Sequence, residues 1–144
     1  PPSLLPGIEE ALSRLSENYH LAIISDTGFS PGVVLRELLE KGNILKYFSA
    51  FSFSDETGVA KPHPKAFRTV LDELDIRAEN ALHIGDIEHT DINGAKTIGM
   101  KAIRFSGDKT ARFTEDNPKI SIADAEVFSW IEIPEIIDNL LNQE

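Results

Sequence analysis

Short apolar segments that alternate with helical patterns constrain the fold of this chain more than any other feature of its sequence. Residues 21–24 (Leu-Ala-Ile-Ile) are apolar without alternation, as in a strand that is covered on both faces. Further strands are predicted at residues 48–53, 81–84, 101–105 and 125–130, and helices precede or separate them. The alternation predicts an α/β fold, a Rossmann-like, mainly parallel sheet with helices on both faces.

The helices are recognised by apolar residues that recur at helical spacing. One begins near residues 6–7, one runs from 31–32 to 42–43, and others cover 65–74, 91–98 and 134–141. The second and third are expected to bury, in turn, Val34, Leu35, Leu38 and Leu39, and Phe67, Val70, Leu71 and Leu74. Residues 54–64 and 106–117 are polar and are predicted to be loops.

Size and charge limit the classes of protein to consider. The 144 residues fit a single domain over residues 1–144. A formal net charge of -10 argues against a binder of nucleic acid or of a membrane surface, because both need a basic face. With no cysteine and no apolar run of about 18 residues, a cytoplasmic location is expected. The chain begins Pro1-Pro2 and its one methionine is Met100. We therefore expect residue 1 to be a point where a longer protein was cut rather than its natural start.

Polar residues follow several of the predicted strands at their carboxyl ends. Ser25-Asp26-Thr27 follow the strand at 21–24, Asp55-Glu56 follow the strand at 48–53, and Gly85-Asp86 follow the strand at 81–84. Ligands of parallel sheets bind beyond the carboxyl ends of the strands. We therefore expect these side chains to gather at one functional edge.

The carboxylates Asp86 and Asp91 are candidate metal ligands. Gly85 allows the chain to turn sharply after its strand, and Asp91 can point back toward Asp86 from the start of the next helix. Two hard oxygen ligands suit Mg²⁺, which binds one or two carboxylates together with water and phosphate. The structural alternative is that Asp86 ends a strand and Asp91 caps a helix.

Three other residues could bind an anion. Ser25 and Thr27 lie where a strand meets its helix, and hydroxyl and N–H groups there can hold a phosphate. Lys61, which Pro62 biases toward an extended backbone, could neutralise the charge of that phosphate. The alternatives are an ordinary turn for the hydroxyl residues and a solvated loop position for the lysine.

Two other kinds of site, a transition-metal site and an aspartic-protease site, fit parts of the sequence. His83, Asp86, His89 and Asp91 could hold a transition metal, but His83 lies within its strand and fits a core or supporting position better. Asp26-Thr27-Gly28 is the triplet that aspartic proteases use. Those enzymes pair two such carboxylates, and the helical patterns here contradict their fold.

Taken together, the motifs resemble the haloacid dehalogenase-like (HAD) superfamily over about residues 3–130. The resemblance rests on residues 21–28, on Lys61-Pro62, on residues 83–86 and on residues 91–95, with Gly99-Met100 as a further match. It implies that Ser25 hydrogen-bonds a transferring phosphoryl group and that Lys61 neutralises charge there. Asp86 would bind Mg²⁺, and Asp91 would support it or orient Lys61. Asp26 is counted with Ser25, Thr27 and Lys61 among the expected substrate contacts. It departs from the family, whose members frequently have Asn at this position, so it is expected to turn away or to bind something other than phosphate.

The nucleophile of the superfamily is missing from this chain. In the family it is the first Asp of an Asp-x-Asp motif, and none of the ten Asp residues here has another Asp two positions away. The resemblance implies that the nucleophile, its strand and a substrate-selecting cap precede residue 1. That strand would be central, between the strands that end at Ser25 and Gly85, so both facing edges are expected to be unpaired or to close on each other.

The resemblance implies an Mg²⁺-dependent phosphomonoester hydrolase that forms an aspartyl-phosphate in its complete form. Its substrate would be a small phosphorylated metabolite, which the sequence does not specify further. Two alternatives stay open: a catalytically inactive binding or regulatory protein, and the dehalogenase branch, which needs no metal at Asp86.

Overall fold

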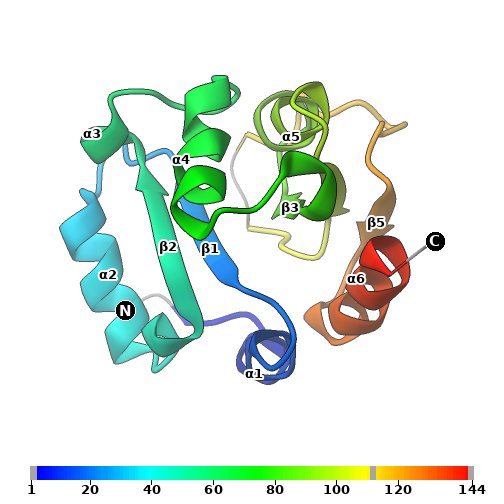
Figure 1. Cartoon of the computed structure of the whole chain (residues 1–144). Helices are drawn as coiled ribbons and strands as arrows, with labels where there is room; N and C mark the ends of the chain where they lie inside the picture. The colour runs from blue at the N-terminus through cyan, green and yellow to red at the C-terminus, as the bar shows by residue number, and fades with distance from the viewer. Residues whose placement is uncertain (1–2, 111–112, 143–144) are drawn as a thin grey trace.

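Five strands form two parallel sheets in the computed structural model, which describes residues 3–110 and 113–142 (Figure 1). The first sheet pairs β1 (Leu21–Ser25) with β2 (Phe48–Phe53). The second has the order β3-β4-β5, with β3 at Leu82–Gly85, β4 at Lys101–Phe105 and β5 at Ala125–Val127. All three pairings are parallel, and the predicted α/β, Rossmann-like fold is confirmed.

Helices connect the strands and cover the sheets. They are α1 (Ile8–Ser16), α2 (Gly32–Lys41), α3 (Ser54–Thr57), α4 (Pro64–Leu74), α5 (Asn93–Thr97) and α6 (Ile133–Leu141). Short 3₁₀ turns occur at Leu45–Tyr47, Ala78–Asn80 and Trp130–Glu132, and a single π-helical turn, η3, covers Glu88–Ile92. Within the described ranges, none of these helices has the length and apolar character needed to cross a bilayer.

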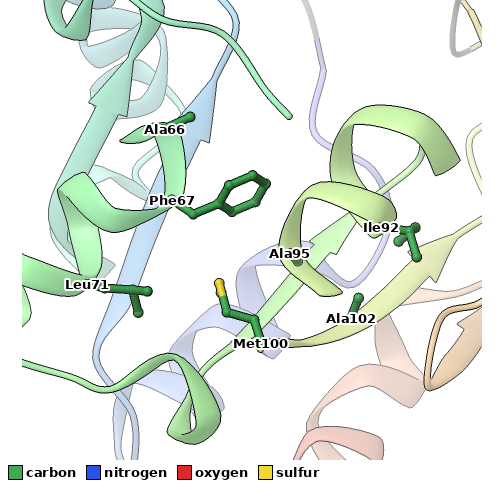
Figure 2. Packing of buried hydrophobic residues seen from close by; sticks show 7 residues of the cluster. All are labelled: Ala66, Phe67, Leu71, Ile92, Ala95, Met100 and Ala102. Carbon is green, nitrogen blue, oxygen red and sulfur yellow. The ribbon is translucent and has the colours of Figure 1, made fainter. Parts of the chain in front are cut away.

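Two apolar clusters lie on opposite faces of β4. Ala102 faces a cluster that includes Phe67 of α4 and Ala95 of α5, and Figure 2 shows the Phe67 ring directed toward α5. Ile103, the next residue, packs instead with Leu15 of α1 and with α6. Because successive side chains of a strand point to opposite faces, both faces of this sheet are covered by helices.

The two sheets do not join. Among the described residues, the edges of β1 and β3 that face each other carry no partner strand, as predicted for a missing central strand. A cavity of about 410 Å³ lies between them and is lined by residues of both strands, including Ile23 and Ile84. Trp130 also lines this cavity, and its buried Nε1 atom has no hydrogen-bond partner in the described part of the chain.

Several predicted details differ from the structure. Val34 and Leu38 of α2 are exposed rather than buried, because α2 lies beside the outer strand β2 and turns only part of its apolar stripe inward (Figure 1). Residues 54–57 of the predicted loop form the short helix α3. The helix expected from residue 91 begins earlier, as the turn η3. The strand expected over 125–130 ends at Val127, and Trp130 starts a 3₁₀ turn.

Candidate functional site

The carboxyl ends of β1 and β3 bring the predicted site residues to one edge of the molecule. Ser25 is the last residue of β1, and Asp86 follows Gly85 directly at the end of β3. In the described part of the chain, the half-buried hydroxyl of Ser25 has no hydrogen-bond partner, so it is available to a ligand. Lys61 reaches this edge from the loop between α3 and α4.

Lys61 joins β1 to the η3 turn. Its ammonium Nζ lies 2.7 Å from Asp91 Oδ1 and 3.3 Å from the carbonyl oxygen of Ile24 in β1. The side chain retains 12% of its exposure, so the charge is largely withdrawn from bulk water. The backbone N–H of Lys61 donates to Asp26 Oδ1 at 2.9 Å. This contact holds the Asp26 carboxylate against the backbone of the Lys61 loop.

Asp91 is the buried anchor of Lys61. Its Oδ1 atom accepts from Lys61 and lies 2.9 Å from His83 Nε2, and its Oδ2 atom accepts from the backbone N–H of Ile87 at 3.1 Å. Burial alone would raise the pKa of Asp91, but the His83 hydrogen bond and the Lys61 charge outweigh it and lower that pKa well below its usual range. Both carboxylate oxygens of Asp91 are thus engaged inside the protein.

Gly85 makes room for this anchor. A Cβ atom at residue 85 would overlap the Cβ and carboxyl group of Asp91. The glycine therefore allows close packing of the η3 turn against the end of β3, which brings the Asp91 carboxylate within reach of Lys61. This reason differs from the predicted one, a sharp turn of the backbone, because steric space is what the Asp91 side chain needs.

The contact between His83 and Asp91 was not predicted from the sequence. His83 was predicted to have a core or supporting position, and the structure pairs it with Asp91. Phe67 holds its ring in an edge-on arrangement with centroids 5.2 Å apart. The spacing of residues 83 and 85 could have indicated the contact with Asp91. Both positions lie on the same side of the strand, so the residue that packs against Gly85 also contacts His83.

The Asp86 carboxylate, at the end of β3, has a raised pKa. Burial raises its pKa, the nearby charge of Asp91 raises it further, and Lys61 opposes the shift. Asp108, in the loop after β4, adds to the raised pKa and was not predicted from the sequence. In the described residues, Asp86 forms no ion pair with a Lys, Arg or His side chain. A divalent cation with oxygen preference therefore fits at Asp86.

The alternative transition-metal cluster is not supported by the geometry. No group of three or more His, Cys, Asp or Glu side chains is arranged to hold a metal in the portion of the chain that is described. His83 instead points its Nε2 atom at Asp91. A Mg²⁺ ion, which takes only one or two protein carboxylates, does not require such a group.

Thr27 uses its donors within the protein. Its backbone N–H donates to Ser54 Oγ at 2.7 Å, and its hydroxyl donates to Asp55 Oδ1 at 2.6 Å. Asp55 in turn accepts from the N–H of Gly32, the first residue of α2, and the Thr27 hydrogen bond lowers the pKa of that carboxyl. Thr27 and Asp55 thus tie the start of α2 to α3, which leaves Thr27 without a free donor for a phosphate.

The sequence and fold have known relatives. Residues 2–105 match the model of the family of haloacid dehalogenase-like hydrolases. The chain is 39% identical over 102 residues to a glyceraldehyde 3-phosphate phosphatase of Pyrococcus abyssi, covering 70% of this chain and 42% of the relative. It is 32% identical over 113 residues to a ribulose-1,5-bisphosphate 5-phosphatase of Halopiger xanaduensis, covering 78% of this chain and 46% of the relative.

The fold is also similar to that of a solved phosphatase structure. A HAD phosphatase from Thermococcus onnurineus superposes with a TM-score of 0.77 at 25% identity, covering 93% of this chain and 58% of the other. The chain thus spans about half the length of each of these three proteins. By the family model, the phosphatase relatives and the shared fold, it belongs to the family of haloacid dehalogenase-like hydrolases.

Proposed function

We propose that this chain is part of an Mg²⁺-dependent phosphomonoester hydrolase, with the phosphoryl group bound between the ends of β1 and β3. The observation that carries the proposal is the position of Lys61, whose ammonium group is held by Asp91 and by the β1 carbonyl of Ile24. Phosphoryl transfer depends mainly on positioning and on neutralised charge. A lysine fixed between two sheet ends supplies both.

The residues at this edge have separate roles. The Ser25 hydroxyl would donate a hydrogen bond to a phosphoryl oxygen, and the Lys61 ammonium would neutralise charge on the same group. Asp86 would hold Mg²⁺, which supplies positive charge against the phosphate in an otherwise acidic protein. Asp91 would act on Lys61, as their 2.7 Å contact supports. Thr27 and Asp26, both predicted as substrate contacts, are hydrogen-bonded within the protein instead.

The nucleophile is proposed to come from a segment that precedes residue 1. The unpaired edges of β1 and β3, the apolar cavity between them and the unpartnered Trp130 Nε1 atom support a further strand at this place. Backbone groups of such a strand would pair with both edges, and a carbonyl oxygen could accept from Trp130. An Asp at its carboxyl end would lie beside Ser25 and Lys61 and would form the aspartyl-phosphate.

The phosphatase relatives support hydrolysis of a phosphate ester, but their names give different substrates. We therefore propose a small phosphorylated metabolite as the substrate class and no single compound. Residues 1–144 would form one domain that is incomplete on its N-terminal side. A cytoplasmic location is proposed as well, in keeping with a chain that contains no cysteine.

Phosphate release from p-nitrophenyl phosphate tests this proposal in the longer protein that includes the upstream coding segment. Lys61→Met should lower kcat by about 10²–10³-fold, because it removes a preorganised charge at the transferring group. Lys41→Met, at the exposed end of α2, is the matched control and should change kcat little. In a parallel assay with a 2-haloacid as substrate, halide release without phosphate release from p-nitrophenyl phosphate would indicate the dehalogenase branch. Ligand binding without turnover would indicate a binding or regulatory protein.

A further inference from the structure

A buried ionic network ties the loop after β4 to the turn that carries Asp86. Arg104 of β4 and Glu88 of η3 are 6% and 5% exposed, and their side chains lie 3.4 Å apart. Arg104 also donates to the carbonyl of Pro118 at 2.8 Å. Glu88 accepts from the Ser121 hydroxyl and, at 2.8 Å, from the N–H of Ile122. The segment 118–122 is therefore fixed to η3 through charged groups that are buried.

Asn117 immediately precedes this segment and contacts the Asp86 turn directly. Its Nδ2 atom donates to the backbone carbonyl of Asp86 at 2.7 Å. Its Oδ1 atom accepts from the backbone N–H of Glu88 at 2.9 Å. One side chain thus holds both ends of the tripeptide 86–88.

Asp91 completes the restraint from within the protein. Its Oδ2 atom accepts from the N–H of Ile87, the residue between the two that Asn117 holds. Three consecutive backbone groups are therefore fixed: the carbonyl of Asp86, the N–H of Ile87 and the N–H of Glu88. Because the direction of a side chain follows from its backbone, this restraint sets where the Asp86 carboxylate points.

We propose that Asn117 is a positioning residue for Asp86 and thereby for its metal, an inference that rests on the proposed function. A merely structural role is the competing explanation. The loop keeps its other attachments, Arg104 to Pro118 and Glu88 to Ser121, when the Asn117 amide is removed. Loss of Asn117 should therefore free the Asp86 turn while the loop stays in place.

Mn²⁺ titration of the ¹⁵N-labelled chain, followed by NMR, tests the inference without any assay of activity. In the unchanged chain, Mn²⁺ should broaden the amide signals of residues 85–87, and Asp86→Asn should abolish this effect. Asn117→Ala should raise the Mn²⁺ concentration for half-broadening about tenfold, the size typical for a group that orients a metal ligand. It should also speed hydrogen exchange of the Glu88 amide, whose acceptor is lost.

Two control variants separate positioning from general loosening. Ser121→Ala removes an attachment of the same loop that does not contact residue 86, and Asn18→Ala removes an exposed amide at the opposite end of β1. Both should bind Mn²⁺ as the unchanged chain does. Equal binding by Asn117→Ala, or an equal loss in Ser121→Ala, would overturn the positioning role alone. Undiminished broadening in Asp86→Asn would overturn the metal site of the proposed function, and the role of Asn117 with it.

Discussion

Replacing Gly85 by alanine tests the packing that places Lys61. The added Cβ atom would overlap the Cβ and carboxyl carbon of Asp91, which lie close to the backbone and cannot swing away as the end of a long side chain could. The Asp91 side chain is only 4% exposed, so no open space receives it. The variant must therefore separate η3 from β3 or displace Asp91 from Lys61 and His83.

The expected cost can be worked out from these contacts. Overpacking costs about 1–3 kcal/mol, and each hydrogen bond to a charged group contributes about 1.5–3 kcal/mol, of which part would be lost. Alanine also restricts the backbone of the unfolded chain, which stabilises the folded state by at most about 1 kcal/mol. We expect Gly85→Ala to lower the free energy of unfolding by about 2–4 kcal/mol.

Urea unfolding followed by circular dichroism measures this difference. Gly28→Ala is the matched control, since nothing lies within 4 Å of a Cβ atom at residue 28, and its free energy of unfolding should change by less than about 0.5 kcal/mol. A Gly85→Ala variant as stable as Gly28→Ala would show that the close packing of Asp91 on β3 does not constrain residue 85.

Three further predictions concern charge and the cavity. Folding lowers the pKa of Asp91, so its ionised carboxylate adds to the free energy of unfolding. This contribution is complete above the ordinary Asp pKa of about 3.9 and decreases as the pH falls below that value. Asp91→Asn should therefore be less stable than the unchanged chain at pH 7, and urea unfolding should show the gap narrowing at pH 3. Arg104→Met should lower the free energy of unfolding by about 3–5 kcal/mol, because it leaves Glu88 buried without its cation. Arg77→Met, in an exposed ion pair, should lower it by at most about 1 kcal/mol. Equal unfolding midpoints of the two variants in urea would contradict this difference. Trp130 is the one tryptophan of the 144 residues. Its quenching by acrylamide should fall in the longer protein, with any upstream tryptophan replaced by phenylalanine, if a strand fills the cavity, and unchanged quenching would argue against that strand.

Much of the fold follows from local patterns in the sequence. The aromatic run at 48–53 and the run at 101–105 form strands with the predicted bounds, because both are short and apolar. The orientation of α2 could not be predicted, since its stripe includes Val34 and Leu38, which the structure exposes beside the outer strand. Helical spacing identifies an apolar face, but the neighbouring elements decide how much of it is buried.

The residues of the candidate site that form motifs with a regular spacing along the chain could be predicted. Ser25 and Asp86 lie at the ends of β1 and β3, and the order of the elements brings the Lys61 loop and the η3 turn with Asp91 to the same place. The contacts of Thr27 with α3 and of Asn117 with residue 86 join segments 27 and 31 positions apart. Nothing in the local sequence reports such pairings, because they depend on how the sheets and loops pack.

Phosphate release by the longer protein, compared with that of the 144-residue chain, tests the central claim most directly. If a preceding strand fills the gap between β1 and β3 and brings the nucleophile to Lys61, the longer protein should release phosphate from p-nitrophenyl phosphate in the presence of Mg²⁺. The 144-residue chain should then show no turnover under the same conditions. Equal rates from both proteins would contradict the proposed origin of the nucleophile, and no release from either would contradict the phosphatase itself.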